Sequence, residues 1–350
     1  MDSLEGITHS FCSMEFQTRN ELYRWVLESV GKVTSEAGRL NLPILGQGIV
    51  GPPQIEYSKL NISNTVLSKR KLIELVNDKI VTGWDDPRMP TIQGLKRRGY
   101  TPDAINDFCH RIGMGFGISS QSLVDYSLLE ECLRQDLENK APRIMAVLHP
   151  LKVNITNISN DSLKNVTALN FPNLKDKSTT RNILVGNVIY IEKCDFQMED
   201  SPKYYRLAPN KIVRLKYFGL IKCIDIKTDE NKNPVELFVE LLPENYKPPK
   251  RIRGTINWVS EIDHTDVQIR IYKHLFSHDG STNDDQWKTK LNQNSIEKKI
   301  IKADCSIKTA KQFDKFQFER IGFFSVDSMD LVENRLILNQ IVPLKEDKNK

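Results

Sequence analysis

The sequence lacks the features that mark secreted, zinc-binding or membrane-spanning proteins. Its six cysteines are scattered, and no Cys-x-x-Cys pair or nearby histidine gives the ligand spacing of a zinc site. No apolar run approaches the roughly 18 residues of a membrane-spanning helix, and the acidic start resembles neither a signal peptide nor a transit peptide. We therefore expect a cytoplasmic protein with reduced thiols, no membrane association and no protein-bound metal.

The sequence also lacks a large excess of charge of one sign. Lys and Arg supply 50 residues against 45 acidic ones, which gives a net charge of +5. Such a balance allows an anionic partner to bind through local basic faces without requiring one. With 350 residues, of which 39% are hydrophobic, the chain can bury sizeable cores. Its length predicts about two or three domains.

The first 140 residues have the apolar spacing of helices. Asn20 can cap a helix that has Trp25 on its apolar face, and Gly31 is placed to end it. We interpret this helix as a packing element. Residues 32–54 are rich in glycine and proline, so they indicate a loop or an insertion.

Further helices are expected between residues 68 and 139. One begins at Ser68 and turns Leu72, Ile73 and Val76 inward. Another begins at Thr101, where a hydroxyl cap precedes a proline in the first turn, and ends at Gly113. The last extends from about Gln121 to Asn139, with Leu129, Cys132 and Leu133 among its buried residues.

The periodicity changes after Pro142 to short apolar or alternating runs, which are typical of β-sandwiches and barrels. In the last predicted strand, Val267, Ile269 and Ile271 alternate with polar residues, so Arg270 is expected on a solvent-facing side where a ligand can reach it. Loops are expected at 157–181, 227–234 and 278–298. The predicted strands are 144–155, 182–191, 212–225, 235–241, 251–258 and 267–275.

Two neighbouring segments suggest chemistry. Ser68, Lys69 and Arg70 place a hydroxyl and two cations at a loop tip, which suits binding a polyphosphate while charge develops on it. A short distance along the chain, two prolines surround Arg88 and stiffen the backbone. We interpret Asp85 and Asp86 as acids that orient Arg88 rather than as a magnesium pair.

Several motifs together resemble those of glutaminyl-tRNA synthetases, which belong to the class I aminoacyl-tRNA synthetases. They occur in the family's order and cover nearly the whole chain, which makes the signal much more specific than any one tetrapeptide. The motifs are Ile7-Thr8-His9-Ser10, Met14-Glu15-Phe16-Gln17, Leu67-Ser68-Lys69-Arg70-Lys71, Trp84 to Thr91, Arg97-Arg98-Gly99-Tyr100-Thr101, Ala141 to Val147, Asn257-Trp258-Val259-Ser260 and Phe316-Gln317-Phe318-Glu319-Arg320.

This resemblance implies a multidomain protein, α/β plus all-β. Residues 1–66 would form the C-terminal part of a Rossmann-type catalytic domain, with an insertion near 32–54. Residues 67–140 would carry the signature loop and a helical subdomain. Residues 141–350 would form two anticodon-binding β-barrels, the distal one over roughly 175–262 and the proximal one from the flanking segments.

The family's His-Ile-Gly-His signature, which lies in the first half of the nucleotide-binding fold, is not found in this sequence. We therefore expect a C-terminal portion that binds tRNA but does not activate glutamine alone. The resemblance assigns catalysis to Lys69 and Ser68, with Lys69 stabilising the departing pyrophosphate. Neither reaction step needs a protein nucleophile, so positioning and charge stabilisation are the main requirements. The residues implied in ATP binding are Ser13, Lys59, Leu60, Leu67, Ser68 and Lys69.

The implied partners are glutamine tRNA, glutamine, and ATP with Mg²⁺. We expect a monomer, either alone or within a complex of synthetases. Two alternatives remain open: a glutamyl-tRNA synthetase and a noncatalytic tRNA-binding module. Arginine and glutamine fixed on strands suit recognition of unpaired bases. The residues implied in tRNA and anticodon binding are Arg143, Arg206, Arg214, Lys216, Gln317 and Arg320.

Overall fold

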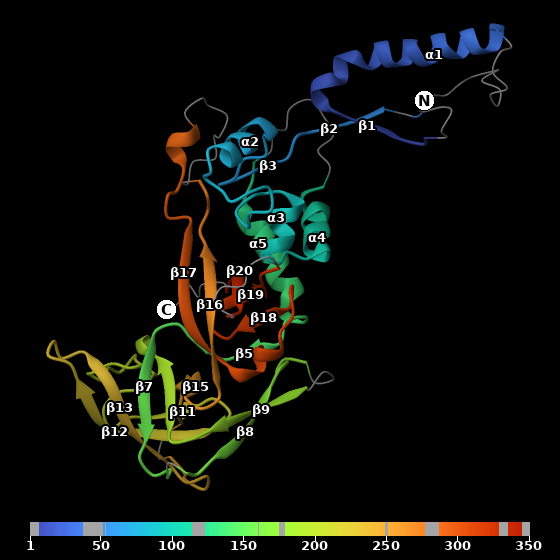
Figure 1. The fold of residues 1–350 in the computed structure, drawn as a ribbon. Coiled ribbons are helices and arrows are strands. Elements are labelled where there is room, and N and C mark those ends of the chain that lie inside the picture. The colour runs from blue at the N-terminus through green and yellow to red at the C-terminus, as the bar shows by residue number, and fades with distance from the viewer. Residues whose placement is uncertain are drawn as a thin grey trace.

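The computed structural model describes residues 7–37, 52, 54–113, 123–159, 161–174, 179–248, 251–276, 287–328 and 335–344. The molecule is elongated, with α1 at one end, a group of helices in the middle and two sheets at the other end (Figure 1). None of its described helices combines the length and the apolar character that crossing a membrane requires.

The N-terminal part is a strand–helix–strand unit. Strand β1 (Ser10–Ser13) pairs in parallel with β2 (Gln54–Tyr57), and between them come the 3₁₀ helix η1 (Met14–Arg19) and α1 (Asn20–Ala37). The expected caps of α1 are wrong, because Asn20 lies inside the first turn and the helix continues past Gly31. The helix is not packed on its predicted apolar face, since Trp25 is 63% exposed. Of the expected insertion at 32–54, residues 38–51 and 53 lie outside the described part.

In the described residues, four short helices follow: α2 (Lys69–Asn77), α3 (Ile92–Arg98), α4 (Pro102–Ile112) and α5 (Tyr126–Glu138). The predicted start of α4 is confirmed, because the hydroxyl of Thr101 accepts a hydrogen bond from the backbone N–H of Ala104, and Gly113 ends the helix as expected. The predicted beginning of α5 is five residues early, but Leu129, Cys132 and Leu133 are buried as expected. The short strands β3 (Asn61–Ile62) and β4 (Leu123–Val124) pair in parallel beside these helices.

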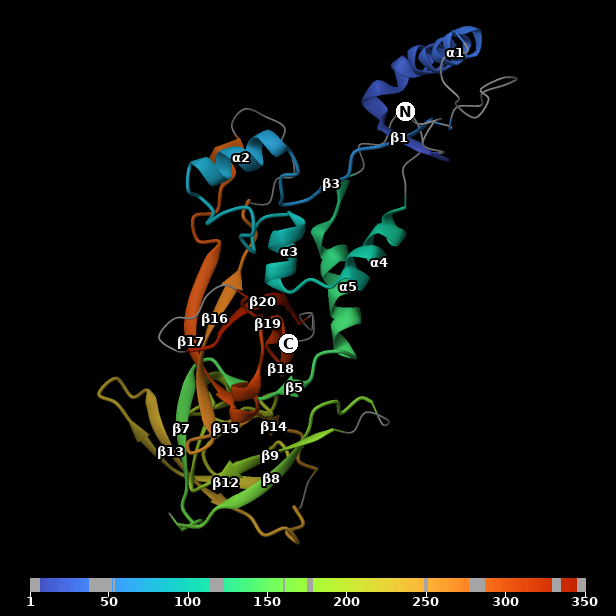
Figure 2. The same ribbon diagram turned by 45° about the vertical axis from the view of Figure 1, so that its right-hand side comes forward.

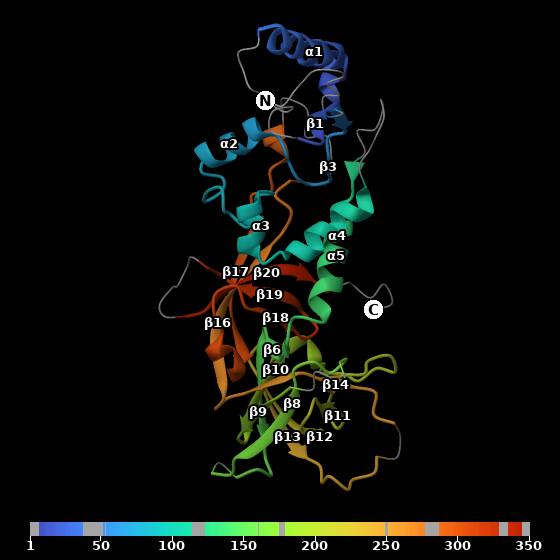
Figure 3. The same cartoon turned by 90° about the vertical axis from the view of Figure 1, so that its right-hand side faces the viewer.

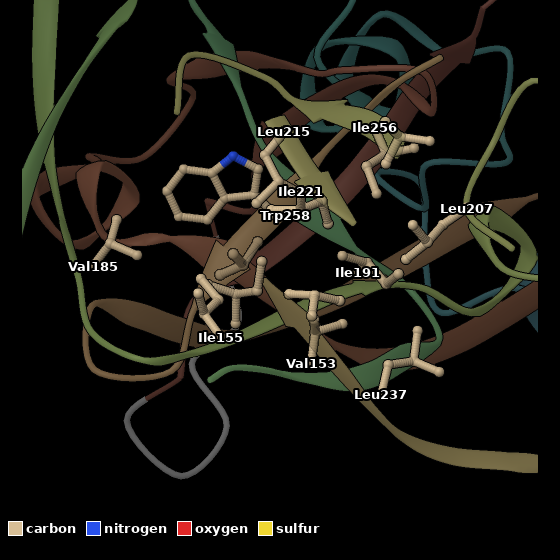
Figure 4. Packing of buried hydrophobic residues seen from close by; sticks show 14 of the residues in the cluster. Val153, Ile155, Val185, Ile191, Leu207, Leu215, Ile221, Leu237, Ile256 and Trp258 are labelled. Atoms are coloured by element: carbon tan, nitrogen blue, oxygen red, sulfur yellow. The ribbon is translucent and has the colours of Figure 1, made fainter. Parts of the chain in front are cut away.

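The sheet farthest from α1, here called the distal sheet, has seven strands (Figure 3). The β8–β9 hairpin shares its core, although β8 was predicted to be a loop. Figure 4 shows Val153, Ile191 and Leu237 gathered with Trp258 in this core. The order is β14 (Thr255–Ile256), β11 (Ile212–Leu215), β12 (Gly219–Thr228), β13 (Pro234–Leu241), β7 (Pro150–Ile155), β10 (Val188–Glu192) and β15 (Trp258–Ser260), with β8 (Lys164–Leu169) and β9 (Thr180–Val185) as the hairpin.

The second sheet, here called the proximal sheet, also has seven strands and lies between the distal sheet and the helices (Figure 2). Its ends come from short strands near residue 145, while its middle comes from the C-terminal third of the chain. Most of these later strands were not predicted from periodicity. The order is β5 (Arg143–Ile144), β18 (Lys315–Phe318), β19 (Gly322–Val326), β20 (Ile337–Pro343), β16 (His264–Tyr272), β17 (Ile296–Asp304) and β6 (Ala146–Val147).

Two cores fix the helices to the proximal sheet. Phe108 of α4 and Leu133 of α5 pack with Phe323 and Ile341 of the sheet. Removing such side chains from water stabilises the contact by about 1.5–3 kcal/mol each. The other core joins α2 to residues that follow β16, and within it Leu75 of α2 is fully buried. Short 3₁₀ helices complete the chain at η3 (Lys193–Asp195), η4 (Trp287–Lys290) and η5 (Cys305–Thr309).

Candidate functional site

The residues of the implied signature loop lie where α2 begins. Ser68 occupies the N-cap position, but its hydroxyl makes no capping hydrogen bond. Lys69 is the first residue of the helix, and both side chains are exposed, as is Leu67. The unused hydroxyl and the ammonium therefore lie at the positive end of a helix, which is an arrangement that favours phosphate groups.

Helix α2 is held by contacts with η4, which lies between β16 and β17 in the chain. Lys288 of η4 forms ion pairs with Glu74 and Asp78 at 3.0 and 2.9 Å. The ammonium of Lys71 lies 5.7 Å from the centre of the buried Trp287 ring, in the range of a cation–π contact. Figure 1 shows η4, in orange, near α2 at the end of the long β16–β17 pair. The signature residues thus lie on a helix that the proximal sheet holds in place.

The buried face of α2 differs in part from the prediction. Leu72 is buried as expected and Val76 is partly buried. The prediction for Ile73 is wrong, because its side chain is exposed. Lys71 is buried instead, because its ammonium lies over Trp287 and its methylene chain can lie along the apolar core.

The other residues implied in ATP binding divide into two places. Leu60 and Leu67 line one cavity of about 180 Å³ beneath the Trp84 segment. Lys59 forms an ion pair with Glu15, which brings it next to η1. Ser13 ends β1, and the β1–β2 pair lies away from α2 (Figures 1 and 2), so the structure does not bring Ser13 together with Lys69.

The stiff turn around Arg88 is held by Asp86. The carboxylate of Asp86 accepts hydrogen bonds from the backbone N–H of Arg88 at 2.9 Å and from its Nη2 at 2.7 Å. Arg88 also donates from Nη1 to the Oγ of Ser295, which joins the turn to the residue just before β17. Burial raises the pKa of Asp86, but the bonds from Arg88 and Thr82 outweigh this effect and hold the pKa below its usual value. The predicted role of Asp86 is therefore confirmed.

Asp85 has a different partner from the one predicted. Its carboxylate pairs with Arg97 of α3 at 2.9 Å, so it does not orient Arg88. Arg97 also reaches the fully buried Asp327, which in turn accepts from Arg270 at 3.2 Å and from Asn339 at 2.7 Å. The expectation that Arg270 faces solvent is therefore wrong. Its side chain is buried against Asp327, because α3 covers the face of the sheet that the alternation indicated as wet.

The residues implied in anticodon binding come together where the two sheets meet, mostly around residues 317–320. Arg143 of β5 and Gln317 of β18 are neighbours in parallel strands. The Nε of Arg143 donates to the Oε1 of Gln317 at 2.9 Å. This bond fixes the amide oxygen, so the Gln317 side chain presents its NH₂ group away from Arg143.

Lys216 and Glu319 link the two sheets through their tight turns. Lys216 follows β11 of the distal sheet and forms an ion pair with Glu319, which follows β18 of the proximal sheet. The backbone oxygens of both residues are also bound: Trp258 donates from Nε1 to Lys216, and Asn257 donates from Nδ2 to Glu319. The Asn257-Trp258 motif therefore locks the two turns against each other.

Arg206 and Arg320 meet at one buried carboxylate. Arg320 donates from both terminal nitrogens to the two oxygens of Asp195, each at 2.7 Å. Arg206 forms an ion pair with the same carboxylate through Nη1 at 3.0 Å, and this nitrogen also donates to the carbonyl of Cys194 at 3.2 Å. The bond to Asp195 raises the pKa of Arg320, so its charge is secure at all ordinary pH values. Asp195 was not predicted from the sequence, because a single acid in a short turn carries no local signal.

Arg214 lies apart from these contacts. Its side chain is exposed on β11, and its backbone N–H donates to the carbonyl of Gly254 at 2.9 Å. Beyond that edge is an open groove of about 620 Å³ lined by Tyr204, Tyr205 and Arg253. The guanidinium of Arg253 lies 5.5 Å from the ring centre of Tyr205, which places charge and a π-face side by side. Arg253 was not among the residues predicted from the sequence.

Comparison with protein families agrees with this arrangement. A model described as class I (E and Q) tRNA synthetases, catalytic domain, matches residues 1–139. Two models of that group's anticodon-binding domain match residues 141–242 and 255–327. The chain belongs to the class I (E and Q) tRNA synthetases. The catalytic match thus covers α1 to α5. The anticodon-binding matches cover the strands of the two sheets except β20, which lies beyond residue 327.

Individual members of the synthetase family align with the whole chain. A probable glutamine–tRNA ligase of Dictyostelium discoideum is 40% identical over all of this chain and 42% of its own length. The glutamine–tRNA ligase of Lupinus luteus is 41% identical with the same coverage. That of Vibrio cholerae serotype O1 is 39% identical over 99% of this chain and 59% of its own length. The chain spans about half the length of these relatives.

Proposed function

We propose that this chain is part of a glutamine–tRNA ligase and that the junction of its two sheets binds the anticodon loop of glutamine tRNA. The observation that carries this proposal is the turn at residues 317–320. Through Gln317, Glu319 and Arg320, this turn contacts Arg143, Lys216 and Asp195. Cations and an amide from both sheets are thereby set in fixed directions, as reading unpaired bases requires.

The proposed domain boundaries follow the resemblance. Residues 1–66 would be catalytic and Rossmann-type, which the parallel β1–α1–β2 unit supports. Residues 67–140 would form the helical subdomain, supported by α2 to α5. Residues 141–350 would form the two anticodon-binding barrels. We extend the distal barrel beyond 175–262 to include β7, because that strand lies inside the distal sheet.

For the chemistry, we propose that Ser68 and Lys69 act on the triphosphate of ATP. A lysine at the start of a helix can neutralise charge that grows on the departing pyrophosphate while glutamine is activated. Ser13, Lys59, Leu60 and Leu67 would contact the nucleotide. Mg²⁺ would enter with ATP, held mainly by the substrate's own phosphates. The described residues contain no group of three or more His, Cys, Asp or Glu that could hold a separate metal ion.

In a protein containing this chain that activates glutamine, replacing Lys69 tests this role. Lys69→Ala should lower the rate of pyrophosphate exchange far more than it lowers the affinity for ATP, because the charge acts in the transition state. Arg70→Ala is the matched control, since it removes the neighbouring exposed cation. Equal losses from the two variants would contradict the assignment of Lys69.

The proposed partners are glutamine tRNA, glutamine and ATP, acting in the cytoplasm. The names of the relatives above favour glutamine over glutamate as the amino acid. We propose a monomer, alone or within a complex of synthetases. For the tRNA part, phosphate contacts should supply salt-dependent affinity, while base contacts should supply the discrimination.

The tRNA proposal is tested by direct binding. Fluorescence anisotropy would compare glutamine tRNA with a version in which only the anticodon is exchanged, each at two salt concentrations. The purified chain should bind the first RNA more tightly, and both affinities should fall as salt rises. A chain that binds the two RNAs equally well at both salt concentrations would overturn the assignment of the sheet junction.

A further inference from the structure

Asp195 is placed to organise two arginines that come from different parts of the chain. It ends η3, directly after β10, and its side chain is fully buried. Arg320 comes from the turn after β18, 125 residues further along the chain. Arg206 comes from the segment before β11. A single carboxylate therefore holds two cations that would repel each other without it.

The geometry leaves the outer sides of both guanidinium groups toward solvent. Arg320 uses one N–H on each terminal nitrogen for Asp195, so about three of its five donors do not point at the carboxylate. The side chains of Arg320 and Arg206 are 33% and 29% exposed, although Asp195 itself is not exposed at all. The buried acid thus contacts both cations from the protein side, while part of each guanidinium group is accessible to solvent. Arg206 is held further by a hydrogen bond from its Nη1 to the carbonyl of Cys194 at 3.2 Å.

The backbone around the cluster is also constrained. Arg320 adopts a left-handed conformation with φ of 67°, which is uncommon for a residue other than glycine. On the other side, the backbone N–H of Leu207, next to Arg206, donates to the carbonyl of Asp195 at 3.0 Å. Because the backbone beside each arginine is held in place, the two guanidinium groups lose little conformational freedom when a ligand binds.

We propose that Asp195 is a positioning residue for anticodon discrimination, and that it sets Arg206 and Arg320 as a preorganised donor pair for the acceptor atoms of an unpaired RNA base. This inference rests on the proposed function. Arginine forks recognise a pair of base acceptors only when their direction is fixed. Attraction of phosphates depends on charge alone and needs no such direction.

Because base contacts depend on direction and phosphate attraction does not, replacing Asp195 should affect anticodon discrimination and overall RNA affinity differently. Asp195→Asn keeps the size of the side chain and removes one negative charge beside two arginines. The local charge then becomes more positive, so binding to any RNA should stay equal or become tighter. The directions of the guanidinium groups are lost, so discrimination between anticodons should fall. Simple structural damage would instead weaken binding to both RNAs.

A matched control comes from the second aspartate that holds two arginines. Asp327 pairs with Arg97 and Arg270 at the junction of α3 and the proximal sheet, where all three residues are buried. Asp327→Asn makes the same chemical change away from the candidate anticodon residues. It should destabilise the fold while leaving the preference between RNAs unchanged in the folded protein.

The experiment measures the ratio of dissociation constants for the anticodon-exchanged and the glutamine tRNA, using the parent chain, Asp195→Asn and Asp327→Asn. Loss of a directed base contact corresponds to about a 5- to 150-fold change in this ratio. We expect a fall of at least about fivefold in Asp195→Asn, with the exchanged RNA bound no more weakly than by the parent. Asp195→Glu, which keeps the charge but displaces it by one methylene, should give an intermediate ratio.

A double-mutant cycle separates an effect through the arginines from a general one. In the Arg320→Ala background, Asp195→Asn should change the ratio less than in the parent, since one of the groups it positions is missing. If the parent chain discriminates between the two RNAs and the Asp195→Asn and Asp195→Glu variants discriminate equally well, the inference is overturned but the proposed function is not. A parent that does not discriminate would instead contradict the proposed function. Weaker binding of both RNAs by the same factor would assign Asp195 a structural role and also overturn the inference.

Discussion

Two buried aspartates in this molecule each hold a pair of arginines, but their surroundings differ. Around Asp195 the arginine side chains are 33% and 29% exposed, whereas around Asp327 both are only 10% exposed. The ion pairs between Asp195 and its arginines are 2.7–3.0 Å long, and those between Asp327 and its arginines are 3.2–3.3 Å. A buried aspartate that holds two arginines can therefore either leave them accessible to a ligand or join parts of the fold. Access of solvent to the far side of the guanidinium groups distinguishes the two uses.

The cluster at Asp327 lies between elements that must stay together. Arg97 belongs to α3, Arg270 to β16, and Asn339 to β20, and each donates to the same carboxylate. Asn339 additionally donates to the backbone carbonyl of Arg97 at 3.1 Å. The Asp327 cluster thus joins the region that matches the catalytic-domain model to the region that matches the anticodon-binding models. The Asp195 cluster joins the distal sheet to the proximal sheet.

The largest expected effect is on stability at Asp327. Asp327→Ala should lower the free energy of unfolding by about 3–5 kcal/mol, because it leaves buried arginines without their shared carboxylate. Urea unfolding followed by circular dichroism measures this change. A loss below about 1 kcal/mol, the range of exposed ion pairs, would remove the distinction between the two clusters.

The second-largest expected effect is on RNA binding at the Asp195 cluster. Arg320→Ala should weaken binding of glutamine tRNA by about 1–3 kcal/mol and narrow the gap to the anticodon-exchanged RNA. Arg143→Ala should act in the same direction, because it removes the partner that orients Gln317. Anisotropy titrations measure both variants, and Arg97→Ala provides a buried arginine as control. Unchanged titrations for Arg320→Ala and Arg143→Ala would show that these two residues do not read the anticodon.

A smaller and less specific effect is expected at Lys216. If its ammonium contacts a phosphate, Lys216→Ala should weaken both RNAs alike and make the salt dependence shallower by about one unit of slope. The loss should be the same for either anticodon, since phosphates carry no sequence information. A change confined to glutamine tRNA would instead place Lys216 with Arg320 among the base contacts.

The smallest effect concerns a third buried aspartate, Asp86. Its pKa is lowered in the folded state, so it contributes stability at pH values above the unfolded pKa of about 3.9. That contribution is lost as the pH falls through the lower, folded value. Unfolding free energies of the parent and of Asp86→Asn, measured from pH 7 to pH 3, should therefore differ less at the acidic end than at pH 7. A constant difference across this range would contradict the sign of the shift.

The sequence by itself determined the features that depend on neighbouring residues. Thr101 and Pro102 begin α4, and Gly113 ends it, because caps and φ restrictions act within one turn. The change from helical to strand periodicity after Pro142 was also evident from the spacing of apolar residues. The order and identity of the motifs predicted the synthetase family, which the family comparison confirmed.

Only the tertiary structure decided which faces were covered and which charges met. Arg270 is buried because α3 packs on β20, the strand next to its own, and Trp25 is exposed because no described element covers its side of α1. The pairing of Asp195 with Arg206 and Arg320 joins residues up to 125 positions apart. Side-chain alternation indicates that a strand has two faces, but long-range packing determines what each face contacts, so no local pattern could predict these contacts.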